Sequence, residues 1–266
     1  MKYSGVIGVF DSGVGGLSVL HHIRAILPEA DLIYIADSGH VPYGDKSADY
    51  IEQRSHTLTR FLISQGAEAI VIACNTATAA AVASLRRDFG IPIIGMEPAV
   101  KPAVAATRSG VVGVLATVGT LESARFAALL EKYAGDVKIV TQSCPGLVEQ
   151  VERGDLSGAL TLELIARYTE PLLARGADTL ILGCTHYPFL TPLLQELLGT
   201  EIALVDTGAA VARQLQRRIH SELNEPLIGQ ADEQFFTSGD TAQASRIMSA
   251  LWGKAVSTTS LPNEFA

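Results

Sequence analysis

Two cysteines stand at matching places in the chain, each directly after a short apolar segment. Cys74 follows Ala-Ile-Val-Ile-Ala, and Cys184 follows Leu-Ile-Leu-Gly. Open α/β sheets bind ligands at the carboxyl ends of such strands. Two thiols on opposite sides of one ligand would suit inversion of a stereocentre, in which a base removes a proton from one face and an acid delivers another to the opposite face.

A buried structural role is the commoner outcome for one cysteine. Two at equivalent sites favour paired chemistry instead. We expect each to lie where a strand leads into a helix, a setting typical of thiols with lowered pKa. Cys144 has no counterpart, so a structural role is expected for it.

The loop Asp-Ser-Gly-Val-Gly-Gly at residues 11–16 follows an apolar segment and precedes a helical pattern. Its backbone N–H groups could hold a carboxylate. It also resembles a dinucleotide fingerprint, but Ser18 stands where the final glycine would be. Asp11 could cap the following helix, act on a substrate ammonium group or help a cysteine take its proton.

His186 follows Cys184 by two residues, which favours a supporting role in proton transfer over an ordinary core histidine. A zinc site is set aside, because Cys-Thr-His matches no common ligand spacing. Tyr43 and Gly44 form a turn that is either structural or an exposed loop closing over the cleft. Small polar side chains at strand ends suit a small polar ligand, with helix capping as the alternative: Ser12, Asn75, Thr76, Thr78, Thr117, Thr120 and Thr185.

These residues need a scaffold of short buried strands, which the sequence provides in two series. The first comprises residues 6–10, 32–36, 69–73 and 91–95, and the second comprises residues 111–115, 137–140, 179–182 and 202–205. Helical patterns such as residues 17–27 and 48–65 lie between them, so the order predicts an α/β fold with parallel sheets covered on both faces.

The two series appear as copies of each other. Residues 65–76 align with residues 175–186 without a gap, at a spacing of 110, and residues 8–12 align with 113–117 at a spacing of 105. This predicts two similar α/β domains facing each other across a cleft. We place residues 1–97 and 208–266 in the domain that carries Cys74, and residues 98–207 in the domain that carries Cys184.

Composition limits the partners. The chain of 266 residues is 48% hydrophobic and 18% charged, with a net charge of −8 and scattered basic residues. This indicates a globular protein whose main partner is not a nucleic acid. No apolar run is long enough to span a membrane, and residues 1–3 lead into a strand without a secretory pattern. Three cysteines form no disulfide framework, so we expect a cytoplasmic protein.

Four motifs together resemble those of the glutamate racemases, within the aspartate/glutamate racemase family. They are Asp-Ser-Gly-Val-Gly-Gly-Leu at 11–17, Val-Pro-Tyr-Gly at 41–44, Ala-Cys-Asn-Thr-Ala-Thr at 73–78 and Leu-Gly-Cys-Thr-His-Tyr-Pro at 182–188. The resemblance covers essentially the whole chain. It implies two flavodoxin-like domains related by pseudo-twofold symmetry, with a pyridoxal-independent site between them and no cofactor or metal.

The implied activity interconverts L- and D-glutamate and supplies D-glutamate for peptidoglycan. Cys74 would exchange the proton of D-glutamate and Cys184 that of L-glutamate, assisted by Asp11 and His186. Glu149 and Glu152 resemble an acidic stretch near the site, and the sequence does not separate them. The resemblance allows a homodimer. The implied substrate contacts are Asp11, Ser12, Tyr43, Gly44, Asn75, Thr76, Thr117, Thr120, Thr185 and His186.

Two alternatives stay open at this point. One is a related enzyme, such as an aspartate or hydantoin racemase, or a decarboxylase that acts through one cysteine. The other is a two-domain protein that binds an acidic metabolite without turning it over. Loss of activity in each single Cys→Ser variant would argue against a one-cysteine enzyme, and α-proton exchange with solvent would exclude a binding protein.

Overall fold

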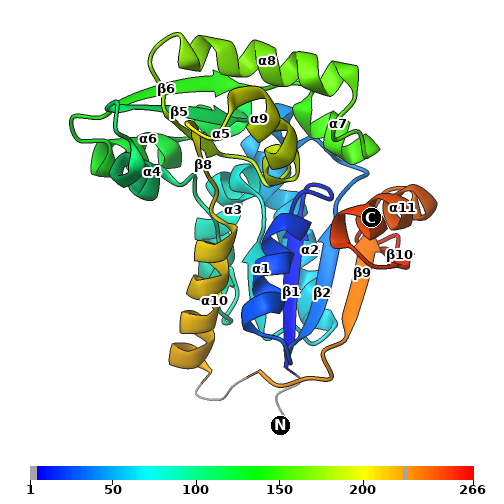
Figure 1. Cartoon of the computed structure of the whole chain (residues 1–266). Helices are drawn as coiled ribbons and strands as arrows, with labels where there is room; N and C mark the ends of the chain where they lie inside the picture. The colour runs from blue at the N-terminus through cyan, green and yellow to red at the C-terminus, as the bar shows by residue number, and fades with distance from the viewer. Residues whose placement is uncertain (1–4, 224–226) are drawn as a thin grey trace.

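The computed structural model describes residues 5–223 and 227–266. The expectation that the chain begins without a secretory pattern rests on residues 1–3, which lie outside the described residues. Strands and helices alternate along the chain, as the α/β prediction requires. The strands form two separate sheets, and every strand pair in both is parallel. Figure 1 shows the second sheet and its helices above the first.

The first sheet has six strands in the order β10-β9-β2-β1-β3-β4. The last two strands of the chain extend this sheet: β9 pairs with β2, and β10 pairs with β9. The domain bounds at residues 97 and 207 stay a prediction. The strands are β1 (Val6–Asp11), β2 (Asp31–Ala36), β3 (Ala69–Ile72), β4 (Ile93–Ile94), β9 (Glu233–Thr237) and β10 (Thr258–Ser260).

The second sheet has four strands in the order β6-β5-β7-β8, the same pattern as β2-β1-β3-β4 in the first. Both follow the flavodoxin-like order 2-1-3-4. The predicted strands are thus confirmed, with ends shifted by a few residues. They are β5 (Val111–Ala116), β6 (Lys138–Ser143), β7 (Thr179–Leu182) and β8 (Ala203–Val205).

The strand register supports the duplication. Gly8 of β1 pairs with Ile70 of β3, and Gly113 of β5 pairs with Leu180 of β7. A Cβ atom on Gly8 would lie 2.9 Å from Ile70 Cδ1, and one on Gly113 would lie 2.5 Å from Leu180 Cδ2. Both central strands therefore keep a glycine at the same place, where a neighbouring aliphatic side chain covers the backbone.

Helices cover both sheets. In Figure 1, α10 runs from the end of the second sheet back along α1, against which it packs. Among the described residues no helix is both long and apolar enough to span a bilayer. The helices are α1 (Leu17–Ile26), α2 (Ala48–Ser64), α3 (Asn75–Asp88), α4 (Val100–Ala106), α5 (Val118–Leu121), α6 (Ala124–Tyr133), α7 (Leu147–Arg153), α8 (Ala159–Leu173), α9 (Thr191–Leu198), α10 (Gly208–Glu222) and α11 (Thr241–Trp252), with the 3-10 turns η1 (Tyr43–Asp45) and η2 (Tyr187–Leu190).

The largest buried apolar cluster continues from one half of the chain to the other. It joins side chains of β1 and α1, such as Val9 and Leu20, to Leu182 and Tyr187 of the second half. Each sheet has a further apolar cluster on another face. The halves are therefore held together by buried apolar surface, and the polar site lies beside that contact.

Candidate active site

The site lies where the strand order reverses in each sheet. In the flavodoxin-like order this is the gap between the first and third strands, here β1/β3 and β5/β7, where ligands bind. A small cavity lies between the two halves at these strand ends. Its walls are Ser12, Pro42, Tyr43, Gly44, Cys74, Asn75, Thr76, Thr117, Val148, Gly183, Cys184, Thr185 and His186.

Thr78 lies outside this cavity, and its hydroxyl accepts a hydrogen bond from the Met96 N–H at 3.0 Å. The implied catalytic and substrate-binding residues line the cavity, with two exceptions. Asp11 and Thr120 are buried behind the wall. The Asp11 carboxylate accepts a hydrogen bond from the Thr185 hydroxyl at 3.1 Å. The Thr120 hydroxyl contacts that of Thr76 at 3.2 Å. Both therefore act on residues of the cavity wall and do not themselves face the cavity.

Cys74 begins a helix, as the sequence predicts. It is the N-cap of α3, and its sulfur accepts a weak hydrogen bond from the Ala77 N–H at 3.5 Å. The thiol faces the Ser12 hydroxyl at 4.0 Å. The expected lowering of its pKa is wrong, because burial, reinforced by the charge of Asp11, raises the Cys74 pKa well above its usual value. The raised pKa favours the protonated thiol, which is the form that can donate a proton.

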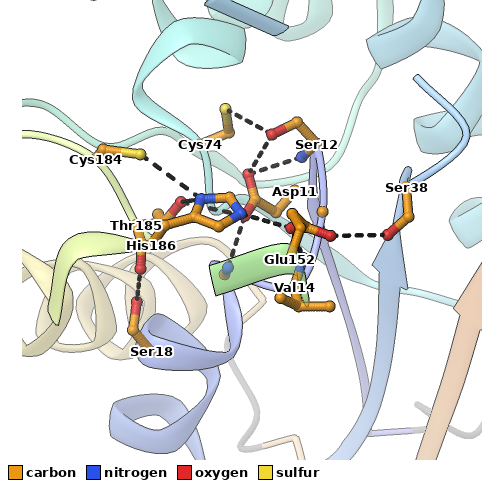
Figure 2. A network of polar contacts seen from close by, with 12 residues as sticks. Asp11, Ser12, Val14, Ser18, Ser38, Cys74, Glu152, Cys184, Thr185 and His186 are labelled. Atoms are coloured by element: carbon orange, nitrogen blue, oxygen red, sulfur yellow. Dashed lines mark hydrogen bonds and ion pairs between the residues drawn. The ribbon is translucent and has the colours of Figure 1, made fainter. Parts of the chain in front are cut away.

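Cys184 has a different environment. A turn and η2 follow it, so the expected helix start is wrong here; α9 begins only at Thr191. Its sulfur lies 3.6 Å from Nδ1 of His186, and Nε2 of the same ring lies 2.6 Å from Oε1 of Glu152. Figure 2 shows the imidazole between the thiol and the carboxylate.

The electrostatics of this row favour a charged imidazole. Burial alone would lower the His186 pKa, but the hydrogen bonds to Cys184 and Glu152 outweigh it and raise the pKa well above its usual value. An imidazolium beside a thiol is the standard means of stabilising a thiolate. A neutral His186 ring can therefore accept the proton of the Cys184 thiol at Nδ1 and become the imidazolium, which leaves a sulfur able to act as a base.

Glu152, and not Glu149, is the carboxylate at the site. Its Oε1 also accepts a hydrogen bond from the Val14 N–H at 2.7 Å, and its Oε2 lies 3.4 Å from the Ser38 hydroxyl. The sequence did not point to Val14 or Ser38. No local pattern marks them, because their contacts with Glu152 join segments more than a hundred residues apart.

The glycine-rich loop packs directly on this row. A Cβ atom on Gly13 would lie 1.9 Å from Oε1 of Glu152, and one on Gly15 would lie 2.3 Å from Nδ1 of His186. Only glycine lets the backbone come so close. The glycines are thus explained by a close approach to protein side chains.

The expectation that this loop offers its N–H groups to a bound carboxylate is wrong for three of them. The N–H groups of Ser12 and Gly16 donate to Asp11 at 2.7 and 2.6 Å, and that of Val14 donates to Glu152. Burial raises the Asp11 pKa, and the charge of His186 opposes this. Ser18 donates to the Thr185 carbonyl at 2.9 Å, so it joins the two halves at the place where a dinucleotide fingerprint would have glycine.

Polar groups on the opposite wall are suited to hold a substrate. The hydroxyls of Thr76 and Thr117 lie 2.9 Å apart and connect the two halves. Asn75 is buried, and among residues 5–223 and 227–266 neither its amide oxygen nor its amide nitrogen has a hydrogen-bond partner. An orphaned amide in a cavity wall is costly unless a ligand satisfies it. Asn75 is therefore a strong candidate for a direct ligand contact.

The turn at Tyr43 and Gly44 and the third cysteine complete the list of residues singled out in the sequence. Tyr43 lines the cavity but is buried, and its hydroxyl donates to Asp37 at 2.5 Å, so the idea of an exposed tyrosine closing over the cleft is wrong. Gly44 contacts the second half, since a Cβ atom there would lie 3.0 Å from Cβ of Thr117. Cys144 lies outside the cavity wall, and burial raises its pKa to about 12.

Comparison with known proteins gives consistent matches. The model of the Asp/Glu/hydantoin racemase family matches residues 8–215. The glutamate racemase of Ectopseudomonas mendocina is 60% identical over 250 residues, covering 93% of this chain and 95% of that protein. That of Methylococcus capsulatus is 56% identical, covering 98% and 96%.

Solved structures agree with these matches. A glutamate racemase isoform of Bacillus anthracis superimposes with a TM-score of 0.87 at 32% identity, covering 99% of each chain. The Escherichia coli glutamate racemase, solved with L-glutamate and the activator UDP-MurNAc-Ala, superimposes with a TM-score of 0.86 at 32% identity, covering 97% of each chain.

Proposed function

Because the chain belongs to the Asp/Glu/hydantoin racemase family, we propose that it is a glutamate racemase that inverts the Cα atom of glutamate between two thiols. The observation that carries the proposal is the placement of Cys74 and Cys184. They follow equivalent strands of the two halves, and both line one cavity between the halves. Inversion by proton transfer needs such a pair, and the reaction we propose uses no cofactor.

The two thiols start in different states in this mechanism. His186 takes a proton from Cys184 through Nδ1, and Glu152 stabilises the imidazolium through Nε2. The Cys184 thiolate then removes the α-proton of L-glutamate. The Cys74 thiol, whose pKa burial keeps high, donates its proton to the opposite face of Cα and releases D-glutamate. The reverse reaction begins with the thiolate on Cys74.

The substrate must be held by its two carboxylates and its ammonium group while Cα is planar. We assign carboxylate binding to the amide of Asn75 and the hydroxyls of Thr76 and Thr117, which lie in the cavity wall. Thr185 also lies in this wall, but its hydroxyl donates to Asp11, so it can accept a hydrogen bond from the substrate ammonium group. Hydrogen-bond donors to the α-carboxylate stabilise the negative charge that develops when the α-proton leaves. Asp11 orients the Ser12 and Thr185 hydroxyls from behind the wall.

The biological setting is part of the same proposal. D-Glutamate made here would supply peptidoglycan synthesis, and the substrate would be a small molecule met in the cytoplasm. Three free, buried cysteines suit a reducing compartment. A homodimer is a further element of the proposal, and sedimentation of the purified protein would test it.

The test of the function is to follow optical rotation with L-glutamate, D-glutamate and L-aspartate at equal concentrations, without pyridoxal phosphate. The expected result is full racemisation of both glutamate enantiomers at a rate at least about a hundredfold above that of aspartate, since a site built for one chain length rejects another that leaves its polar groups unpaired. Equal or faster turnover of aspartate would overturn the substrate assignment.

A further inference from the structure

A buried ion pair lies just outside the cavity and holds part of its wall. Asp37 follows β2 directly, and its side chain has no solvent exposure. Arg54 of α2 binds both of its oxygens, from Nη2 to Oδ1 at 2.6 Å and from Nε to Oδ2 at 3.0 Å. The Tyr43 hydroxyl donates to Oδ2 at 2.5 Å. One carboxylate thus ties together a strand end, a helix and the turn η1.

Three hydrogen bonds to the Asp37 carboxylate hold this arrangement together. A buried carboxylate is tolerated when it is paired and hydrogen-bonded, and a two-pronged contact with arginine fixes its orientation. Arg54 also donates to the carbonyl oxygens of Phe265 and Ala266, at 3.0 and 3.3 Å. Burial and the charge of Asp37 raise the Tyr43 pKa well above its usual value, so the phenol remains a donor.

The residue held by this cluster belongs to the cavity wall. Pro42, Tyr43 and Gly44 all line the cavity. Gly44 faces Thr117, and a Cβ atom on Gly119 would lie 3.2 Å from the Gly44 carbonyl oxygen. The turn thus forms the place where the first half touches the second beside the hydroxyls of Thr76 and Thr117. Any movement of the Tyr43 ring would shift this contact and the groups that face the substrate.

We infer that Asp37 is a positioning residue for the reaction: through Tyr43 it fixes the turn at residues 42–44 against the second half, and so sets the shape of the substrate-binding wall. The inference rests on the proposed glutamate racemase function and adds a residue that touches no substrate. Within the described part of the chain, no hydrogen bond joins Cys74 or Cys184 to this cluster, so its effect falls on binding more than on proton transfer.

The test is the kinetics of Tyr43→Phe, which removes the hydroxyl and leaves the ion pair in place. KM for glutamate should rise roughly tenfold, the usual effect of losing one hydrogen bond to a charged group, while kcat changes less than about threefold. Asp37→Asn should raise KM at least as much, and Arg54→Lys, which keeps the charge, should give an intermediate value.

Tyr168→Phe is the matched control. Its hydroxyl donates to the Pro145 carbonyl at 2.7 Å, away from the cavity wall, so KM should stay unchanged. A purely structural role of Asp37 would reduce the amount of active protein and lower apparent kcat with KM constant, and that result would overturn the inference. If Asp37→Asn fails to fold, Tyr43→Phe alone decides.

Different results would refute the positioning role of Asp37 and the proposed racemase activity. An unmutated protein that leaves glutamate optically unchanged would refute the racemase proposal itself. An active protein whose Tyr43→Phe variant keeps the original KM would leave that proposal intact and refute the positioning role of Asp37. Direct calorimetric titration with D-glutamate gives a second readout, with a roughly tenfold weaker Kd expected for Tyr43→Phe.

Discussion

Replacement of Glu152 by glutamine would test the proton relay on the side of Cys184. The variant keeps the size of the side chain and an oxygen that can accept the Val14 N–H, but it removes the negative charge 2.6 Å from Nε2 of His186. Hydrogen bonding to this carboxylate is one of the causes that raise the His186 pKa. The variant should therefore hold the imidazolium less firmly and form less Cys184 thiolate.

The size of the effect follows from the burial of the pair. The His186 side chain is 1% exposed and that of Glu152 is 12% exposed, so solvent screens the contact only weakly. A hydrogen bond to a charged group contributes about 1.5–3 kcal/mol, and glutamine retains part of it as a neutral acceptor. We therefore expect kcat/KM to fall by a factor of roughly 10 to 100.

Kinetics in both directions provide the assay. The enantiomers of glutamate have the same free energy in water, so kcat/KM must fall equally from either side, which checks the data internally. The slower step should be the transfer at Cys184, so the deuterium isotope effect should grow for L-glutamate labelled at Cα and shrink for D-glutamate. The fall in activity at high pH, where His186 loses its proton, should move to lower pH because its pKa is less raised.

Glu149→Gln is the matched control, since Glu149 lies one turn earlier on the same helix and is not among the described hydrogen-bond partners of His186. Its kcat/KM should stay within about threefold of the original, as for most substitutions away from a site. Full activity of Glu152→Gln, or an equal loss in Glu149→Gln, would refute the assignment of the relay.

Three further predictions follow from the site. Cys74→Ser and Cys184→Ser should each lower kcat by at least about a thousandfold, because the serine hydroxyl exchanges a proton far less readily than the cysteine thiol, whereas Cys144→Ala should keep kcat within about threefold. The change in optical rotation with time measures kcat for all three variants. A fully active Cys74→Ser variant would contradict the paired mechanism. Asn75→Ala removes a buried amide without partners, so the melting temperature should hold or rise while KM increases at least about tenfold; a lower melting temperature with unchanged KM would argue for a structural role. Gly15→Ala would place a Cβ atom against the neighbouring imidazole ring, so we expect the free energy of unfolding in urea to fall by about 1–3 kcal/mol and kcat to fall as well. An unchanged urea midpoint of unfolding would show that the loop can move to accommodate the methyl group.

The sheets and the paired cysteines could be predicted because their signals are local. Buried parallel strands are unbroken apolar segments, and their duplication is visible as a repeated sequence. The register of Gly8 on Ile70 and of Gly113 on Leu180 confirms that the two sheets are copies at the level of individual contacts. The end of each third strand therefore fixed the position of its thiol.

What could not be predicted depends on contacts between distant segments. Glu149 and Glu152 lie three residues apart on one helix, so they share a face and periodicity cannot separate them. The approach of Gly13 to Glu152 decides between them. The burial of Tyr43 likewise depends on its hydrogen bond to Asp37, whose negative charge is paired with Arg54 of α2. The pKa of Cys74 was misjudged because the helix start was visible in the sequence and the depth of burial was not.

The most direct test of the central claim is to incubate the purified protein with L-glutamate in deuterium oxide and to follow the α-proton signal together with optical rotation. The two-thiol account predicts that D-glutamate forms with deuterium at Cα, because the proton added to one face comes from a thiol that exchanges with solvent and not from the proton removed at the other. D-Glutamate that retains the original α-proton would contradict it, since one group would then have carried the proton from face to face.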